Sequence, residues 1–344
     1  MKTRVGKRAL RATSFVALLC VSQISAAQQI KLRVADSFPT GHWISVNITK
    51  YMMEQVTERT GKKVAFEYYP AEQLGKAKDL LSLTNSGVAD IGYVAPGFVG
   101  DKMPLSVVGE LPLPTSSASA CPLTMAYWKI ARPGGVLDQK EFAPNGVRML
   151  FNIVLPPYQL VNKTRFSTLK DIAGMKIRTS GAPKEFALRK LGAVPIQMPT
   201  PELNEAMSRG TVDGALLPIG SVPSYGLDLI AKYFTFGENF GSFVATYVIS
   251  ERKWKTLPSE VQKVMADMGE ELSRRGCEMA DRQENDNVKK LQLAGVTLVK
   301  LPDSDAPAMR EIQRSVGKDW AEGLDRRGKA GTEILNAFNA ALQQ

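Results

Sequence analysis

Residues 174–181 read GMKIRTSG, a stretch in which two apolar side chains alternate with two cationic ones before a Ser-Gly turn. This alternation predicts a short strand that ends at Arg178. In open α/β sheets, ligands bind beyond the carboxyl ends of the strands, where the last residue of such a strand would point. A guanidinium there offers two parallel donors to a carboxylate. Arg178 is therefore a candidate anion-binding residue, and from spacing alone a surface ion pair is an equally good interpretation.

Neutral side chains at other predicted strand ends are candidates for the wall of a pocket. These aromatic and amide groups, all in or beside loops, are Trp43, Tyr93, Tyr158, Gln159 and Phe240. Groups of this kind line small-molecule sites and set the orientation of the ligand. Each of them taken singly is more often a packing residue, so the pattern becomes informative only if several of them meet.

Motifs of the common enzyme classes are absent from the sequence. There is no G-x-S-x-G elbow, no G-x-x-x-x-G-K-[ST] loop, no G-x-G-x-x-G and no H-E-x-x-H. The single histidine, His42, could act as an acid or base only with partners that the sequence does not locate, so a structural or contact role is favoured. One histidine and few cysteines also disfavour a His/Cys metal site. We expect a protein that is not an enzyme and has no catalytic residues, cofactor or metal.

The first 27 residues have the pattern of a signal peptide. Five Lys and Arg residues precede the apolar run at 15–21, and Ser25 and Ala27 occupy the small −3 and −1 positions of a cleavage site. Seven apolar residues are too few to span a bilayer, which needs about 20. We expect cleavage after Ala27, export to the periplasm and a mature chain that does not span the membrane. Leu19 stands where a lipoprotein would have a small residue before Cys20, which disfavours a lipid anchor.

The overall composition is that of an ordinary globular protein. The chain has 344 residues, enough for two domains at roughly 100 to 200 residues each, although one large domain is also possible. Loss of the leader would halve the net charge of +10, and no Lys/Arg run suggests nucleic acid. The two cysteines of the mature chain, Cys121 and Cys277, could pair in an oxidising compartment, but their positions in the sequence leave this open.

Two α/β units are predicted to position these side chains. In the first, strands at 30–38, 63–70 and 89–96 alternate with helices at 42–61 and 72–87. In the second, strands at 175–178, 194–198 and 212–218 alternate with helices at 183–192 and 201–210. This rhythm is typical of parallel sheets with crossover helices.

The remaining segments connect or brace these units. We expect loops and a short helix at 111–135, a strand at 296–302, and helices at 306–324 and 331–343. Between them, residues 258–292 have the pattern of one long helix with two internal glycines. Such a helix would be roughly 50 Å long, which exceeds one small domain, so we expect it to lie across both.

Several ordered motifs resemble those of a known family, the DctP-type solute receptors of tripartite ATP-independent periplasmic (TRAP) transporters. The core of the resemblance is residues 169–218, which contain "DIAGMKIR", "LGAVP" and "AMSRGTVDG". The segments "YYPAEQLGKAKDLLSLTNSGVADIGYV" (68–94) and "LPSEVQKVM" (257–265) are also similar to the family. The match covers nearly the whole mature chain.

The resemblance implies an α/β, two-domain periplasmic binding protein fold (class II-like), with hinge strands and a long helix spanning both domains. Domain I would comprise residues 28–154 and 242–283, and domain II residues 155–241 and 284–344. Arg178 matches the family arginine that pairs with the carboxylate of the substrate. The resemblance therefore favours ligand binding over the surface ion pair.

The chain departs from many sialic-acid and dicarboxylate receptors at two places. Where those have a second arginine, this chain has "FNIVLPPYQLV" (151–161), with Tyr158 and Gln159 near the expected place. After "VDG", where a polar residue is frequent, stand Leu216, Leu217 and Pro218. A single guanidinium and a more apolar wall indicate a monocarboxylate with an uncharged or aromatic body, because a second buried charge would lack compensation.

The sequence therefore predicts an extracytoplasmic receptor that captures a small organic monocarboxylate, such as an aromatic, hydroxy or keto acid. The resemblance implies that its partners are the small and large integral membrane subunits of a Na⁺-coupled TRAP permease. Three alternatives stay open: a periplasmic enzyme on a similar scaffold, a receptor that serves a sensor system, and the binding protein of an ATP-driven importer.

Overall fold

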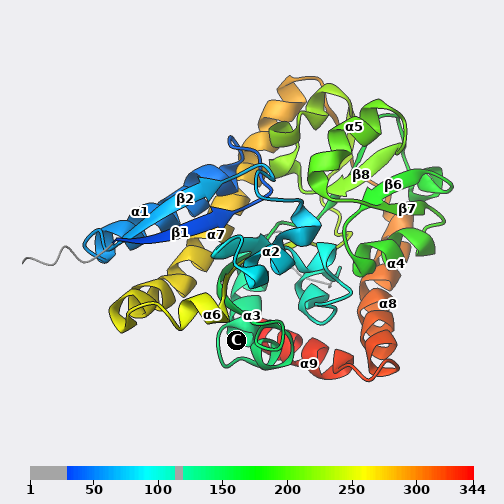
Figure 1. The fold of residues 1–344 in the computed structure, drawn as a ribbon. Helices are drawn as coiled ribbons and strands as arrows, with labels where there is room; N and C mark the ends of the chain where they lie inside the picture. The colour runs from blue at the N-terminus through cyan, green and yellow to red at the C-terminus, as the bar shows by residue number, and fades with distance from the viewer. Residues whose placement is uncertain (1–28, 113–118) are drawn as a thin grey trace, which may run out of the picture.

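Two β-sheets form the framework of the protein (Figure 1). The computed structural model describes residues 29–112 and 119–344. The predicted signal peptide, residues 1–27, lies outside the described residues. The α/β, two-domain architecture with a long helix, predicted from the sequence, is confirmed.

The first sheet has five strands, in the order β2 (Val64–Tyr69), β1 (Ile30–Ala35), β3 (Ile91–Val94), β10 (Val244–Ser250) and β4 (Val147–Val154). Strand β1 pairs in parallel with β2 and β3, as the β-α-β rhythm predicts. Strand β10 is antiparallel to both of its neighbours. The helices of this half of the molecule are α1 (Lys50–Arg59), α2 (Leu80–Ser86), α3 (Cys121–Ala131) and α6 (Glu251–Trp254).

The second sheet has six strands, in the order β11 (Thr297–Val299), β9 (Tyr233–Thr235), β5 (Gln159–Asn162), β8 (Gly214–Leu217), β6 (Lys176–Thr179) and β7 (Val194–Gln197). Strand β6 is parallel to both β7 and β8, so the second predicted unit is also confirmed. Its helices are α4 (Ala182–Lys190) and α5 (Leu203–Ser208).

A single helix, α7 (Ser259–Leu293), connects the two halves (Figure 1). It packs against α1, α3 and β4 beside the first sheet and, near its C-terminal end, against the short helix η8 (Ile219–Ser221) that follows β8. The two glycines inside it, Gly269 and Gly276, do not interrupt it. The sequence-based prediction of one long helix at 258–292 is thus confirmed.

The C-terminal segment visits both halves of the molecule. Helix α8 (Ala306–Asp325) packs against α4, and α9 (Gly331–Leu342) then packs against α3 (Figure 1). The boundaries given above for the two domains stay a prediction. The chain passes between the sheets at three places: from β4 to β5, from β9 to β10 and, through α7, from β10 to β11.

Two local predictions differ from the structure. The helix expected at 72–87 shortens to Leu80–Ser86, because Ala71 and Glu72 have positive φ and the Glu72 carboxylate accepts a hydrogen bond from Ala77 N–H (2.8 Å). Strands β4 and β10 were not predicted. Their residues are apolar almost throughout and buried on both faces, so they lack the alternation that identifies a half-exposed strand.

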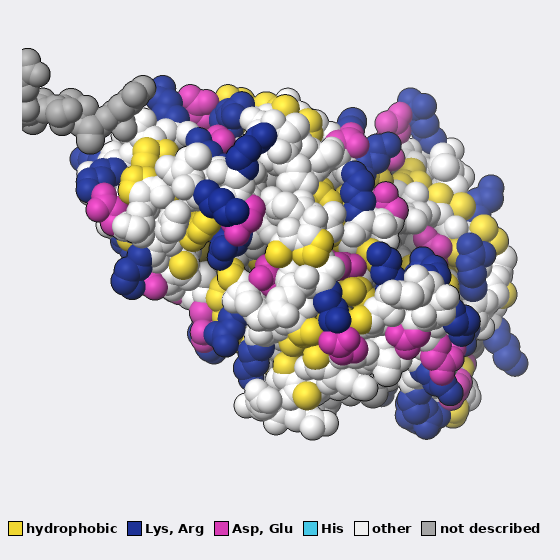
Figure 2. Space-filling view, turned by 60° about the horizontal axis from the view of Figure 1, so that its bottom comes forward, with side chains coloured by type: hydrophobic (Ala, Val, Ile, Leu, Met, Phe, Trp, Pro, Cys, Tyr) yellow, Lys and Arg dark blue, Asp and Glu magenta, His cyan; other side chains and the backbone are white. Residues whose placement is uncertain are grey.

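Charged side chains of both signs are interspersed over the face shown in Figure 2. On that face, the Lys and Arg side chains do not gather into a separate patch. Among the described residues, no helix is both long and apolar enough to cross a membrane.

Candidate functional site

The side chain of Arg178 is fully buried at the end of β6. Its Nε–H donates to Met198 O (2.9 Å), Nη1 donates to Leu216 O (3.3 Å) and Nη2 donates to Thr200 Oγ1 (2.9 Å). A guanidinium has five N–H donors, so two have no partner among the described residues. No described carboxylate forms an ion pair with it. Arg178 is therefore not a surface ion pair.

Burial of this cation without a counter-ion is energetically costly. Burial lowers the pKa of Arg178, although an arginine stays protonated in proteins. A buried charge needs an opposite charge or a full set of hydrogen bonds to offset its lost hydration. The neutral acceptors around Arg178 position the guanidinium but leave its charge uncompensated. An anionic ligand would supply the missing charge.

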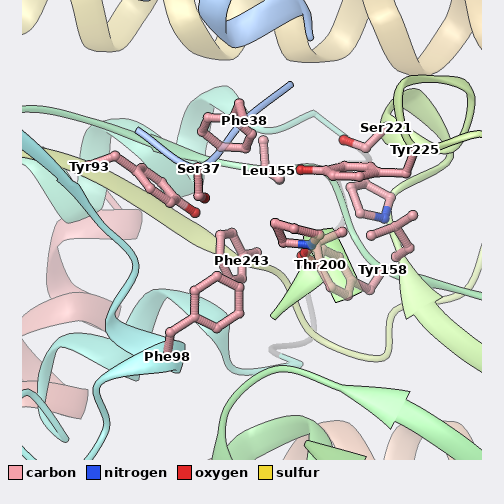
Figure 3. A pocket seen from close by; sticks show the side chains of 13 residues that line it. Ser37, Phe38, Tyr93, Phe98, Leu155, Tyr158, Thr200, Ser221, Tyr225 and Phe243 are labelled. Carbon is pink, nitrogen blue, oxygen red and sulfur yellow. The ribbon is translucent and has the colours of Figure 1, made fainter. Parts of the chain in front are cut away.

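A cavity lies between the two sheets (Figure 3). Arg178 does not line it, but its Nη2 donates to Thr200, which does. The first half of the molecule contributes Ser37, Phe38, Tyr93, Phe98, Leu155 and Phe243, and the second half contributes Tyr158, Thr200, Pro201, Leu217, Pro218, Ser221 and Tyr225. Tyr93 and Tyr225 direct their hydroxyl groups into the cavity from opposite sides (Figure 3). The wall is therefore mainly aromatic and aliphatic, with a few hydroxyl groups.

The walls of this cavity are nearly in contact. About 10 Å³ remain for the centres of water-sized spheres, which is room for about one water molecule. Ring contacts cross between the halves: His42 lies 5.7 Å from Tyr225, centroid to centroid, and also stacks on Phe38 at 4.4 Å. The structure thus has the two halves closed together around the site.

The segment that leads to Phe38 is fixed by a buried carboxylate. Asp36 accepts hydrogen bonds from Phe38 N–H (2.6 Å), Tyr68 Oη (2.8 Å) and Tyr247 Oη (2.9 Å). Burial raises the pKa of Asp36 to about 6, and these donors hold it lower than burial alone would. Asp36 therefore anchors the loop after β1 to two tyrosines of the first sheet.

His42 is also buried. Its Nδ1 accepts a hydrogen bond from Ile44 N–H (3.2 Å), and burial lowers the pKa of His42 to about 3. The neutral ring consequently carries its proton on Nε2, which has no partner among the described residues. Among the described residues, no nucleophile or carboxylate is hydrogen-bonded to His42.

A second buried cation, Lys184 of α4, lies close to the cavity. Its Nζ is 5.2 Å from the ring centroid of Tyr158, donates to Ser242 O (2.6 Å) and forms an ion pair with Glu110 (2.6 Å). Burial raises the pKa of Glu110 and lowers that of Lys184, and the attraction between the two opposite charges opposes both shifts. Unlike Arg178, this cation has its counter-ion within the protein.

The structure brings together several residues proposed from the sequence. Tyr93, Tyr158, Leu217 and Pro218 line the cavity. The other four are buried but do not line it. They are Arg178, which reaches the cavity through its hydrogen bond to Thr200, Trp43, whose ring lies 5.7 Å from His42, Phe240 and Gln159. Their predicted contact with a ligand stays a prediction.

The amide of Gln159 is fully occupied by other parts of the protein. Its Nε2 donates to Glu238 O (2.6 Å) and Pro157 O (3.3 Å), and its Oε1 accepts from Thr235 Oγ1 (2.9 Å) and Glu238 N–H (3.3 Å). Gln159 therefore fastens the segment after β9 to the start of β5. In this position it supports the wall that Tyr158 forms.

Several cavity residues were not predicted from the sequence. Ser37 and Phe38 follow β1, and Phe98 follows β3, so the same rule of strand ends that selected Tyr93 could have found them. Tyr225 and Phe243 lie in segments without a regular pattern, and no sequence signal selects them. Lys184 and Glu110 were missed because a charged residue in a helix is usually a solvated one.

Among the described residues, no group of three or more His, Cys, Asp or Glu could hold a metal ion.

Comparisons with known proteins give a family model that matches most of the chain. The family model described as bacterial extracellular solute-binding protein, family 7 (DctP), matches residues 36–323. A relative named solute-binding protein from Albidiferax ferrireducens is 23% identical over 305 residues, which cover 86% of this chain and 88% of the relative.

Two solved structures have the same fold. A TRAP solute-binding protein from Rhodoferax ferrireducens, in complex with benzoate, has a TM-score of 0.84 at 24% identity and covers 92% of this chain and 98% of its own. A TRAP periplasmic solute-binding protein from Bordetella bronchiseptica, with bound mandelate, has a TM-score of 0.82 at 23% identity. The match covers 92% of this chain and 99% of the Bordetella chain.

Proposed function

Because the chain belongs to bacterial extracellular solute-binding protein family 7, the DctP family of TRAP solute-binding proteins, we propose that it binds a small organic monocarboxylate in the cavity between its two sheets. The ligand would be an aromatic, hydroxy or keto acid. The chain would deliver it to a Na⁺-coupled membrane permease with one small and one large integral membrane subunit.

The observation that carries the proposal is the uncompensated charge of Arg178. The side chain is completely buried, three neutral oxygens orient it, and two of its N–H donors are left over. A carboxylate can accept two parallel N–H bonds from a guanidinium. The same contact would neutralise the buried charge, which no described residue does.

The cavity wall favours a ligand whose remainder is uncharged. Phe38, Phe98, Leu155, Leu217 and Phe243 offer mainly apolar surface. A flat ring can pack between such groups, and the tyrosine hydroxyls can bind one further hydroxyl or carbonyl group. The benzoate and mandelate bound by the two structural neighbours are ligands of this type.

The closed arrangement supports a mechanism of capture by domain closure. A ligand of about ten non-hydrogen atoms cannot enter a space for one water molecule, so the walls must first separate. We propose that the two domains, 28–154 plus 242–283 and 155–241 plus 284–344, move about the segments that cross between the sheets. The ligand would stabilise the closed state through its contacts with both.

This function requires export, and we propose that residues 1–27 act as a signal peptide that is removed after Ala27 in the periplasm. We also propose that the chain releases its ligand chemically unchanged. Recovery of a modified compound after prolonged incubation with the purified protein would instead support the enzyme alternative.

The test is a thermal-shift screen of organic acids, including benzoate and mandelate, followed by calorimetry on wild type and Arg178→Ala. A ligand that binds only the folded protein raises the melting temperature. Loss of the guanidinium should weaken binding by about 2 kcal/mol or more, at least about 30-fold. Arg209→Ala is the control, because Arg209 is exposed and pairs with Glu205 on its own helix. Unchanged affinity in Arg178→Ala would refute the proposed role of Arg178.

A further inference from the structure

Lys184 places a second cation next to the ligand cavity. The residue is fully buried in the first turns of α4, and its Nζ lies 5.2 Å from the ring centroid of Tyr158 and 6.0 Å from that of Phe243. Both of these rings line the cavity. By position alone, Lys184 could therefore bind a second negative group of a ligand, beside the one that Arg178 attracts.

Glu110, which belongs to the other half of the molecule, forms an ion pair with Lys184. It is the last residue of the short helix η4 (Ser106–Glu110), which packs against α3 and β10. Its Oε2 lies 2.6 Å from Lys184 Nζ, and its Oε1 accepts a hydrogen bond from Gly97 N–H (3.1 Å). Both side chains are fully buried. The carboxylate is thus held in place by its own half and directed at the lysine of the opposite half.

The surrounding contact between the two halves is close. Gly181 has φ +83°, and a Cβ atom there would lie 2.9 Å from Glu110 Oε2 and 3.2 Å from Gly97 Cα. A second link across the same boundary is the hydrogen bond from Gln197 Nε2 to Gly97 O (3.2 Å). Because residue 181 is a glycine and has no side chain, the start of α4 can approach Glu110 closely enough to form the ion pair.

We propose that Glu110 is a specificity-determining residue, which neutralises Lys184 across the closed cleft so that only the charge of Arg178 is left for the ligand. This inference rests on the proposed function and assigns its charge selectivity to one carboxylate. A ligand with one negative charge balances Arg178. A second negative charge on the ligand would meet a lysine that is already paired, and it would be repelled by Glu110.

The experiment compares ligands of nearly equal size that differ by one charge. The pairs are isophthalate with 3-carbamoylbenzoate and succinate with succinamate, each a diacid and its monoamide. Affinities are measured by calorimetry at pH 6.5 for wild type and for Glu110→Gln, Lys184→Met and the double variant. Glu185→Gln is the matched control, because it removes the negative charge next in sequence to Lys184 without touching the ion pair.

In wild type, the monoamide should bind at least about tenfold more tightly than the diacid. Glu110→Gln leaves Lys184 without a counter-ion and should lower this preference at least about tenfold. Lys184→Met leaves Glu110 unpaired and should raise it. In the double variant, the preference for the monoamide should be within about threefold of the wild-type preference. Glu185→Gln should not change the preference.

An unchanged preference in both single variants would overturn the inference, as would a shift of equal size in Glu185→Gln. If wild type binds the monoamides and Arg178→Ala does not, the proposed function stands whatever the result for Glu110. If wild type binds neither monoamide, the proposed function fails for small monocarboxylates, and the inference fails with it. Should Glu110→Gln fold poorly, the rise predicted for Lys184→Met still decides the question.

Discussion

Cys121 and Cys277 form a disulfide bond that joins the first residue of α3 to the middle of α7, across 156 positions of sequence. The bond lies next to the contact in which Asp281 of α7 accepts hydrogen bonds from Ala120 N–H (2.7 Å) and from Ser119. The start of α3 is thus attached to the long helix by a covalent bond and by hydrogen bonds.

Removal of this disulfide should destabilise the protein without changing the ligand site. The double variant Cys121→Ser/Cys277→Ser should lose about 2–5 kcal/mol of unfolding free energy, because the bond restricts the unfolded chain over a long loop. Urea unfolding of wild type and variant, each with and without a reducing agent, measures this loss. The reducing agent should destabilise wild type and leave the variant unaffected. Equal stability of wild type and variant in the absence of the reducing agent would contradict the prediction.

Glu284 should make stability depend on pH. Its carboxylate accepts hydrogen bonds from Ile219 N–H (3.2 Å) and Gly220 N–H (2.6 Å), and burial raises its pKa from 4.5 to about 7. The folded state therefore binds a proton more tightly than the unfolded state. This contribution to stability is fully present below pH 4.5 and is lost as the pH rises through about 7.

The variant Glu284→Gln should lack this part of the pH profile. Relative to the variant, wild type should lose about 1–3 kcal/mol of unfolding free energy between pH 5 and pH 8, at about 1.4 kcal/mol per unit of pKa shift. Urea unfolding at four pH values in this range gives the two profiles. The raised pKa of Asp36, about 6, is common to both proteins and serves as an internal reference. Parallel profiles would exclude a titrating Glu284.

Gly269 should not tolerate alanine, although alanine is the better helix former. A Cβ atom at this position of α7 would lie 2.6 Å from Leu150 O of β4 and would overlap the ring of Trp128. We expect Gly269→Ala to cost about 1–3 kcal/mol, since the helix would have to move away from the sheet. The control is Gly323→Ala in α8, where the nearest atom is 3.8 Å away and belongs to flexible Arg326. There the change should be neutral or slightly stabilising.

Gln159→Leu distinguishes support of the pocket wall from direct ligand contact. Because both ends of the amide are bonded within the protein, we expect a loss of about 1–3 kcal/mol in stability, from the unsatisfied groups at Glu238 and Thr235. At temperatures where the variant is folded, ligand affinity should change less than about threefold. Calorimetry and urea unfolding on the same preparation compare the two effects. A large loss of affinity at unchanged stability would instead favour the contact predicted from the sequence.

The family resemblance and the repeated strand–helix pattern were enough to predict the two α/β units, the long helix and the short strand that carries Arg178. They worked because parallel strands, crossover helices and helix ends have local signatures in the chain. The same rules failed for β4 and β10, where burial on both faces removes the alternation that identifies a strand.

The sequence by itself predicted that Arg178 is a candidate to bind a carboxylate and that the segment after Gly214 is apolar. Only the tertiary structure decided how many charges the site presents. Lys184 and Glu110 are 74 positions apart, and nothing local distinguishes them from solvated surface residues. Their pairing depends on the approach of two halves of the molecule, and electrostatic balance in a buried site depends on distance in space rather than on position along the chain.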